Sequence, residues 1–195
     1  MAGTVTFAPA QPVALVEPVT LAVAKAHLRV FADSQDALIE RLIRTARQHL
    51  EGVSGVGGIL GRALTRQRLV LTLPAVPAGR MAVSLPRPPF VALVSLSYLD
   101  AAGAAQVIAL DDVETGVDAD RMTVQPIAAA TWPAGTKLAI TYDAGYAAAP
   151  EPVVAAMLLL IEQWYGNRSA AGAAQQALPF AVDALLAPYM THGWI

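Results

Sequence analysis

Apolar residues recur every three or four positions in two stretches near the start of the chain, which predicts two amphipathic helices. The first covers residues 20–30, where Thr20 is placed to cap the first turn, and the second covers residues 36–51. The second helix also carries charged pairs four residues apart on the face opposite its apolar stripe, at Glu40 with Arg44 and at Arg47 with Glu51. We expect that opposite face to be exposed to solvent.

From residue 66 the spacing of apolar residues changes to two, which indicates β-strands. The first strand covers residues 66–73 and ends before Pro74. Further strands are predicted at 80–85, 91–99 and 137–142, with weaker candidates at 106–110 and 121–125. Short strands at such spacing predict a small, mostly antiparallel sheet or barrel.

The C-terminal part returns to helical spacing, at residues 153–165 and 182–187. The predicted fold is therefore α+β, a helical bundle made of N-terminal and C-terminal helices with an inserted antiparallel sheet or barrel. The predicted parts are an extended, proline-containing arm at 1–18, a helical core at 19–55 and 150–190, a β-rich region at 62–146 and a tail at 191–195. The glycine-rich residues 52–61 match no phosphate-binding loop and are interpreted as a flexible connector or assembly loop.

The composition of the chain shows an unusual surplus of apolar residues. Hydrophobic residues make up 55% and charged residues 14%, against about 25% charged in an average soluble domain. The longest apolar run, at 153–161, is far shorter than the roughly 20 residues of a membrane-spanning helix. The first 18 residues do not have the pattern of a secretory signal. We therefore expect the apolar surplus to be covered by protein partners, in a homo-oligomer without contact to a membrane.

The sequence carries little that points to catalysis. It has no cysteine, and its three histidines do not have the spacing of a helical metal site, so no metal or cofactor is predicted. The densest group of acids departs from a calcium loop and is interpreted as a solvated turn between strands; its members are Asp111, Asp112, Glu114, Asp118 and Asp120. We expect no enzyme, although a small metal-independent hydrolase with carboxylates from distant segments stays open. The net charge of -2 makes a nucleic-acid-binding module the weakest alternative.

Seven short motifs, in this order along the chain, resemble the head-tail connector family of tailed phages, also called head-completion or adaptor proteins, which has prophage and gene transfer agent versions. The motifs are TLAVAKAHLR (20–29), DALIERLI (36–43), GRALT (61–65), LPRPP (85–89), VSLSYLD (94–100), ITYDAGY (140–146) and QWYGNR (163–168).

The resemblance implies a structural subunit of a ring, usually of twelve copies, beneath the portal protein of the particle. Such a ring extends the DNA channel and joins the head to a downstream head-tail joining, stopper or tail protein, while double-stranded DNA passes without specific binding. The location implied is the neck of a virion or virus-like particle, assembled in the host bacterial cytoplasm. Another neck or tail ring protein, such as a stopper or terminator, is the alternative within the same biology.

Within this picture two sets of residues are predicted to make protein contacts. The helices of the core are expected to pack adjacent subunits together, through Leu42, Ile43, Leu158, Ile161 and Trp164. The C-terminal segment is expected to contact the portal or another partner, because aromatic side chains often dominate interface energy. Its predicted contact residues are Phe180, Leu185, Leu186, Tyr189 and Trp194.

Overall fold

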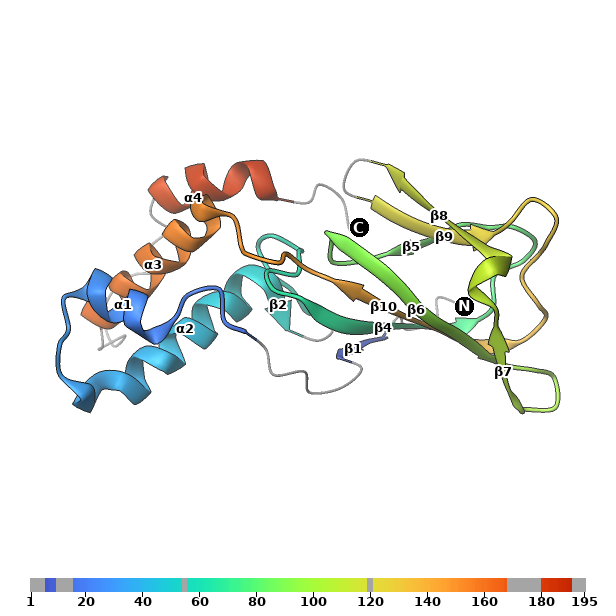
Figure 1. The fold of residues 1–195 in the computed structure, drawn as a ribbon, viewed down its shortest axis with the longest axis horizontal. Coiled ribbons are helices and arrows are strands. Elements are labelled where there is room, and N and C mark those ends of the chain that lie inside the picture. The colour runs from blue at the N-terminus through green and yellow to red at the C-terminus, as the bar shows by residue number, and fades with distance from the viewer. Residues whose placement is uncertain (1–5, 10–15, 54–55, 119–120, 168–179, 191–195) are drawn as a thin grey trace. The chain divides into compact units, whose positions relative to one another are not determined.

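The computed structural model of the chain describes residues 6–9, 16–53, 56–118, 121–167 and 180–190. These residues form two compact units, a helical unit and a β unit (Figure 1). Of the described residues, the helical unit comprises 16–53, 57–65, 146–167 and 180–190, and the β unit comprises 6–9, 56, 66–118 and 121–145. The β unit is thus inserted between the two halves of the helical unit.

The helical unit contains the four α-helices of the described residues, α1 (Leu21–Leu28), α2 (Asp36–Glu51), α3 (Glu151–Gly166) and α4 (Phe180–Leu186), with the short 3-10 helices η1 (Asp33–Gln35) and η3 (Ala187–Tyr189). Helix α2 packs against both α1 and α3, and α3 also packs against α4. All four predicted helices are confirmed, and the bounds of α2 are those read from the sequence.

Helix α1 begins and ends at residues that cap it. The hydroxyl oxygen of Thr20 accepts a hydrogen bond from the backbone N–H of Val23 at 3.3 Å, as the sequence predicts. At the other end Arg29 adopts a left-handed conformation with φ of 56°, and its N–H bonds back to a carbonyl of the last turn. The helix therefore ends at Leu28, a little short of the predicted residue 30.

The core of the helical unit draws on every α-helix. α3 contributes most because it is apolar nearly all round, and it packs on more than one side as predicted. The fully or almost fully buried side chains from the three larger contributors are Ile39, Ile43, Ala46 and Leu50 of α2, Val153, Ala156, Met157, Leu160 and Ile161 of α3, and Val182 and Leu186 of α4.

The segment that follows α2 is packed into this core. Leu60 and Leu64 are completely buried, and the N–H of Leu60 donates to the carbonyl of Leu50 at 2.9 Å. A Cβ atom placed on Gly58 would lie 2.2 Å from the backbone nitrogen of Gly52, so this close approach of two backbone segments needs glycine. The interpretation of this segment as a flexible connector or assembly loop is therefore wrong for residues 58–61.

The β unit contains two antiparallel sheets. The larger has the strand order β1-β4-β10-β6-β7, and the smaller has the order β5-β9-β8. Their strands are β1 (Thr6–Pro9), β4 (Gln67–Ala75), β5 (Val83–Leu85), β6 (Phe90–Leu99), β7 (Ala105–Ile108), β8 (Val113–Asp118), β9 (Arg121–Pro126) and β10 (Thr136–Ala144). A third, two-stranded pair joins β2 (Gly52–Val53) to β3 (Val56–Gly57). The predicted antiparallel sheet is confirmed, and the described strands do not close into a barrel.

Two details of the predicted strands are corrected. Strand β4 continues through Pro74 to Ala75, where it still pairs with β10. The acidic segment interpreted as a solvated turn contains the strand β8, in which Thr115 pairs with Val124 of β9. Strand β8 lies at a sheet edge and is mostly exposed, so its sequence lacks the alternation that a half-buried strand shows.

The interior of the β unit is almost wholly apolar. Its buried residues include Leu69, Leu71, Leu96, Leu138 and Ile140. Tyr142 is buried among them, and its hydroxyl donates to the carbonyl of Pro86 at 2.7 Å. Burial raises the pKa of the Tyr142 phenol, against a smaller opposing influence from Arg87, so this hydroxyl stays protonated as a donor.

Candidate assembly interface

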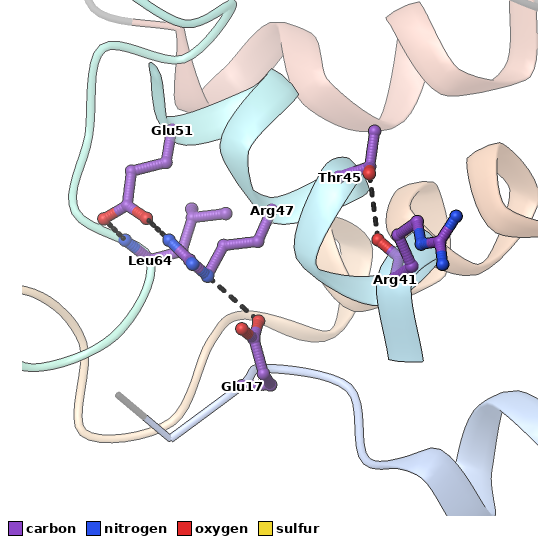
Figure 2. Close-up of polar contacts among 6 residues, drawn as sticks. All are labelled: Glu17, Arg41, Thr45, Arg47, Glu51 and Leu64. Carbon is purple, nitrogen blue, oxygen red and sulfur yellow. Dashed lines mark hydrogen bonds and ion pairs between the residues drawn. The ribbon is translucent and has the colours of Figure 1, made fainter. Parts of the chain in front are cut away.

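A buried ion cluster anchors the chain segments around the C-terminal end of α2. Figure 2 shows Arg47 between two carboxylates: its Nε donates to Glu17 at 2.9 Å and its Nη1 to Glu51 at 2.8 Å. The other carboxylate oxygen of Glu51 accepts the backbone N–H of Leu64 at 3.3 Å. The Glu51 side chain is only 1% exposed. The pair Arg47 and Glu51 therefore does not lie on a solvent-exposed face, which corrects the sequence-based expectation.

This cluster holds Arg47 in its charged form. Burial works to lower the pKa of the guanidinium, but the hydrogen bonds to Glu51 and Glu17 outweigh it and raise the pKa above its ordinary value. The groups of the cluster come from three segments: Glu17 from the segment before α1, Arg47 and Glu51 from α2, and the Leu64 N–H from the loop before β4. Their role is to fasten three separated segments of the helical unit to one another.

A second buried arginine fastens the C-terminal helices. Arg62 is largely buried, and its Nε donates to the carbonyl of Tyr189 in η3 at 2.6 Å. Its Nη1 lies 3.4 Å from the hydroxyl of Tyr146. The motif at 61–65 thus serves a structural purpose: its arginine holds η3, and its Leu64 completes the ion cluster described above.

The loop after α1 presents an exposed phenylalanine on a braced support. Phe31 is 90% exposed. The ammonium group of Lys25 bonds to Asp33 at 2.8 Å and to Asp36 at 2.6 Å, so both ends of the loop are tied together. Beside Phe31 lies a shallow apolar groove of about 460 Å³, lined by Leu21, Ala22, Lys25, Ala26, Val30 and Phe31.

The β unit carries a hollow of about 290 Å³ around Trp132 and the edge strand β7. Its lining is apolar apart from Asp112 and Thr131, and comprises Tyr98, Val107, Ile108, Val113, Pro126, Ala130, Trp132 and Pro133. The indole N–H of Trp132 donates to the carbonyl of Met81 at 2.8 Å, which fixes the ring in place. Val107 on the rim is 78% exposed.

Two further polar contacts lie elsewhere among the described residues. His27 lies 3.1 Å from Glu162 as an isolated contact, and Glu114 is bonded to Arg80 and Gln125 at the surface. In the described ranges no three metal-binding side chains come together. Within those same ranges every helix is too short or too polar to span a bilayer.

Comparison with known proteins gives two kinds of match. Residues 18–75, which contain α1 and α2, match the model of the phage gp6-like head-tail connector protein family. Over nearly its whole length the chain is also similar to solved structures of gene transfer agent particles. The resemblance to the head-tail connector family is confirmed.

Three of these solved structures show how far the similarity extends. A chain in the neck of an empty gene transfer agent particle, computed with C6 symmetry, is 25% identical, with a TM-score of 0.75 and 97% of both chains covered. A chain in the virion of a native gene transfer agent particle is 26% identical, with the same TM-score and coverage. A chain in the neck of a native particle, computed with C12 symmetry, is 26% identical with a TM-score of 0.67, and the match covers 93% of this chain and 97% of that one. A comparison with curated protein sequences finds no match.

Together, the connector family and the neck structures support a structural connector role for this chain. Four of the five C-terminal residues predicted to contact a partner lie within the described residues. Phe180 is 88% exposed at the start of α4, and Leu185 and Tyr189 are half-buried. Leu186 is completely buried in the core, so its contacts lie within its own subunit. Trp194 lies outside the described residues.

The predicted subunit-packing residues also divide into buried and partly exposed ones. Ile43 and Ile161 are buried in the helical core of their own chain, and this gives them an internal packing role. Leu42, Leu158 and Trp164 keep part of their surface exposed and stay predicted contacts. The ring of Trp164 packs edge-on against His49 at a centroid distance of 5.7 Å. Neither Phe31 nor Trp132 was predicted as a contact residue. For Phe31 the sequence offered one indication of exposure, because it is an isolated phenylalanine in the break between two helices.

Proposed function

We propose that this chain is a subunit of an adaptor ring in the neck of a tailed phage or a gene transfer agent particle. The observation that carries the proposal is the similarity over 97% of the chain to a subunit of a gene transfer agent neck. The family match at residues 18–75 supports the same role independently of the full-length fold. The C12 symmetry of a similar neck favours a ring of twelve copies.

The proposed role is structural and not enzymatic. The buried or partly buried charged groups Arg47, Glu51 and Arg62 are engaged in fastening segments of the subunit. The exposed apolar side chains offer contact area to other proteins, as expected for a chain with a hydrophobic content of 55%. The net charge of -2 suits a conduit through which DNA slides without sticking.

The proposed partners are the portal protein on one side and a downstream joining, stopper or tail protein on the other. Among the C-terminal residues, Phe180 is the best placed to contact the portal, because it is almost fully exposed on a helix that is fastened to the core. Tyr189 and Leu185 add partly exposed area on the same segment. Since Val182 and Leu186 are buried, this segment is tested by point substitution and not by deletion of α4.

The test mixes the purified chain with the portal protein of the same particle and measures the products by native mass spectrometry and negative-stain imaging. We expect a ring of the chain bound to portal. Phe180→Ala should weaken attachment to portal while the ring still forms, and Met81→Ala, which removes an exposed apolar side chain from the β unit, should bind as the wild type does. A chain that stays monomeric with portal present would contradict the proposed function.

A further inference from the structure

A closed ring requires two different surfaces on each subunit, one that meets the next copy and one that meets the previous copy. Among their exposed apolar features, the helical unit carries Phe31 with Arg29 beside it, and the β unit carries the space around Trp132 with Asp111 and Asp112 beside it. We define the Phe31 projection as residues 29–31, and the Trp132 hollow as the lined space of about 290 Å³ in the β unit.

The Phe31 projection combines an apolar tip with a positive charge. Arg29 is exposed two residues before Phe31, and none of the described hydrogen bonds or ion pairs engages its guanidinium. The backbone of Arg29 is held in the left-handed region, and the Lys25 contacts to Asp33 and Asp36 brace the loop from the other side. A rigid support lowers the entropy lost when an exposed aromatic side chain binds. The projection is therefore suited to act as an anchor.

The Trp132 hollow has the complementary properties. Most of its lining residues are apolar or aromatic, while polar atoms make up the larger part of the surface that faces the hollow. A cavity of only about 150 Å³ is enough to hold a benzene ring. Its acidic lining residue Asp112 and the neighbouring Asp111 are exposed and form no described ion pair. The hollow thus offers room for a phenyl ring beside Trp132 and next to negative charge.

We propose that in the assembled ring Phe31 of each subunit inserts into the Trp132 hollow of the next subunit, with Arg29 facing Asp111 and Asp112. The match in size and charge identifies the occupant of the hollow as a second copy of this chain. The contact is head-to-tail, so it propagates from copy to copy, and it closes as a ring when the rotation between neighbouring copies completes a full turn. This inference rests on the ring assembly proposed above and names the surfaces that make it.

Cysteine cross-linking tests the contact directly, because the native chain has no cysteine. Copies carrying Phe31→Cys are mixed with differently tagged copies carrying Val107→Cys, in the presence of portal, and then oxidised. We expect covalent dimers of unlike copies, and a ladder of larger multimers from the double variant. The matched control replaces Phe31→Cys by Phe180→Cys, an equally exposed phenylalanine of the helical unit, and should give neither product.

Charge reversal provides a second readout. Arg29→Glu and Asp112→Arg should each weaken ring formation, and combining them in one chain should restore a large part of it, because opposite charges again face each other. Phe31→Ala should raise the protomer concentration needed for ring formation about tenfold or more, in the range of an aromatic anchor residue. All of these side chains are exposed in the subunit, so its fold should be unaffected.

The outcomes separate this contact from the proposed function. A ring that forms normally without cross-linking between residues 31 and 107 overturns the contact and leaves the adaptor role standing. Cross-linking of Phe31→Cys copies to one another also overturns it, because that contact would be symmetric. If Phe31→Ala loses only portal attachment, Phe31 is a portal contact and the inference is wrong. Failure of the wild type to form a ring at all contradicts the proposed function together with the contact.

Discussion

The helical unit and the β unit differ in where they place charged side chains. In the helical unit Glu51 and Arg62 are buried, Arg47 is partly buried, and the three join segments that lie far apart in the sequence. In the β unit the ion pairs Arg68 with Asp143 and Arg80 with Glu114 lie at the surface, and the strand ladders hold the unit together. The difference teaches that a buried ion pair can hold loop segments in place, whereas an exposed ion pair contributes little to the stability of the fold.

The largest effect is expected when the buried cluster is broken. Glu51→Ala removes one of the two carboxylate partners of Arg47 and the acceptor of the Leu64 N–H, which leaves a partly buried guanidinium with Glu17 alone and a buried donor unsatisfied. We expect a loss of about 3–5 kcal/mol in the free energy of unfolding, measured by urea denaturation. The matched control Glu114→Ala removes the exposed partner of Arg80 and should cost about 1 kcal/mol or less. Similar losses for the two variants would break the comparison.

Next in size is the loss of the buried arginine that holds η3. Arg62→Met keeps an extended side chain but removes the donor to the Tyr189 carbonyl. We expect a loss of about 1–3 kcal/mol in unfolding free energy, the range for a buried acceptor left without a partner. Hydrogen exchange should accelerate in residues 180–190 and remain unchanged in the β unit. Unchanged exchange in that segment would show that Arg62 does not fasten it.

The β unit offers a neutral counterpart in Tyr142. Tyr142→Phe removes the hydroxyl that donates to Pro86, so one buried carbonyl loses a hydrogen bond, but no charge is stranded. The unfolding free energy should fall by about 1 kcal/mol, less than for Glu51→Ala. A loss as large as that of Glu51→Ala would mean that the β interior depends on its one buried hydroxyl as strongly as the helical unit depends on its ion cluster.

The elements that the sequence predicted well are those with a strong local pattern. Helix α2 has the predicted bounds, because an apolar stripe marks its buried face and Gly52 stops it. Strand β8 was missed because an exposed edge strand has little apolar alternation. Local pattern therefore sets how much of each unit can be read from the sequence.

The burial of the ion cluster was not predictable for a different reason. The spacing of Arg47 and Glu51 shows that they meet on one helix face, but their burial depends on Glu17 and on the loop at Leu64. Those groups are distant in sequence, and only the tertiary fold brings them together. The same holds for the Trp132 hollow, whose lining comes from five segments of the β unit.

The smallest effect concerns the exposed pair of Arg68 and Asp143, bonded at 2.8 and 3.0 Å. The hydrogen bonds from Arg68, helped by its charge and that of Arg66, hold the pKa of Asp143 below its ordinary value of 3.8. A carboxyl with a lowered pKa in the folded state stabilises the protein above its ordinary pKa, and this contribution is lost as the pH falls through the lowered value. Arg68→Gln should therefore lower the melting temperature slightly at pH 7, and the difference from wild type should shrink below pH 3.8. Arg66→Gln should act in the same direction but less, and a difference that stays constant with pH would show that Arg68 acts through packing and not through this ion pair.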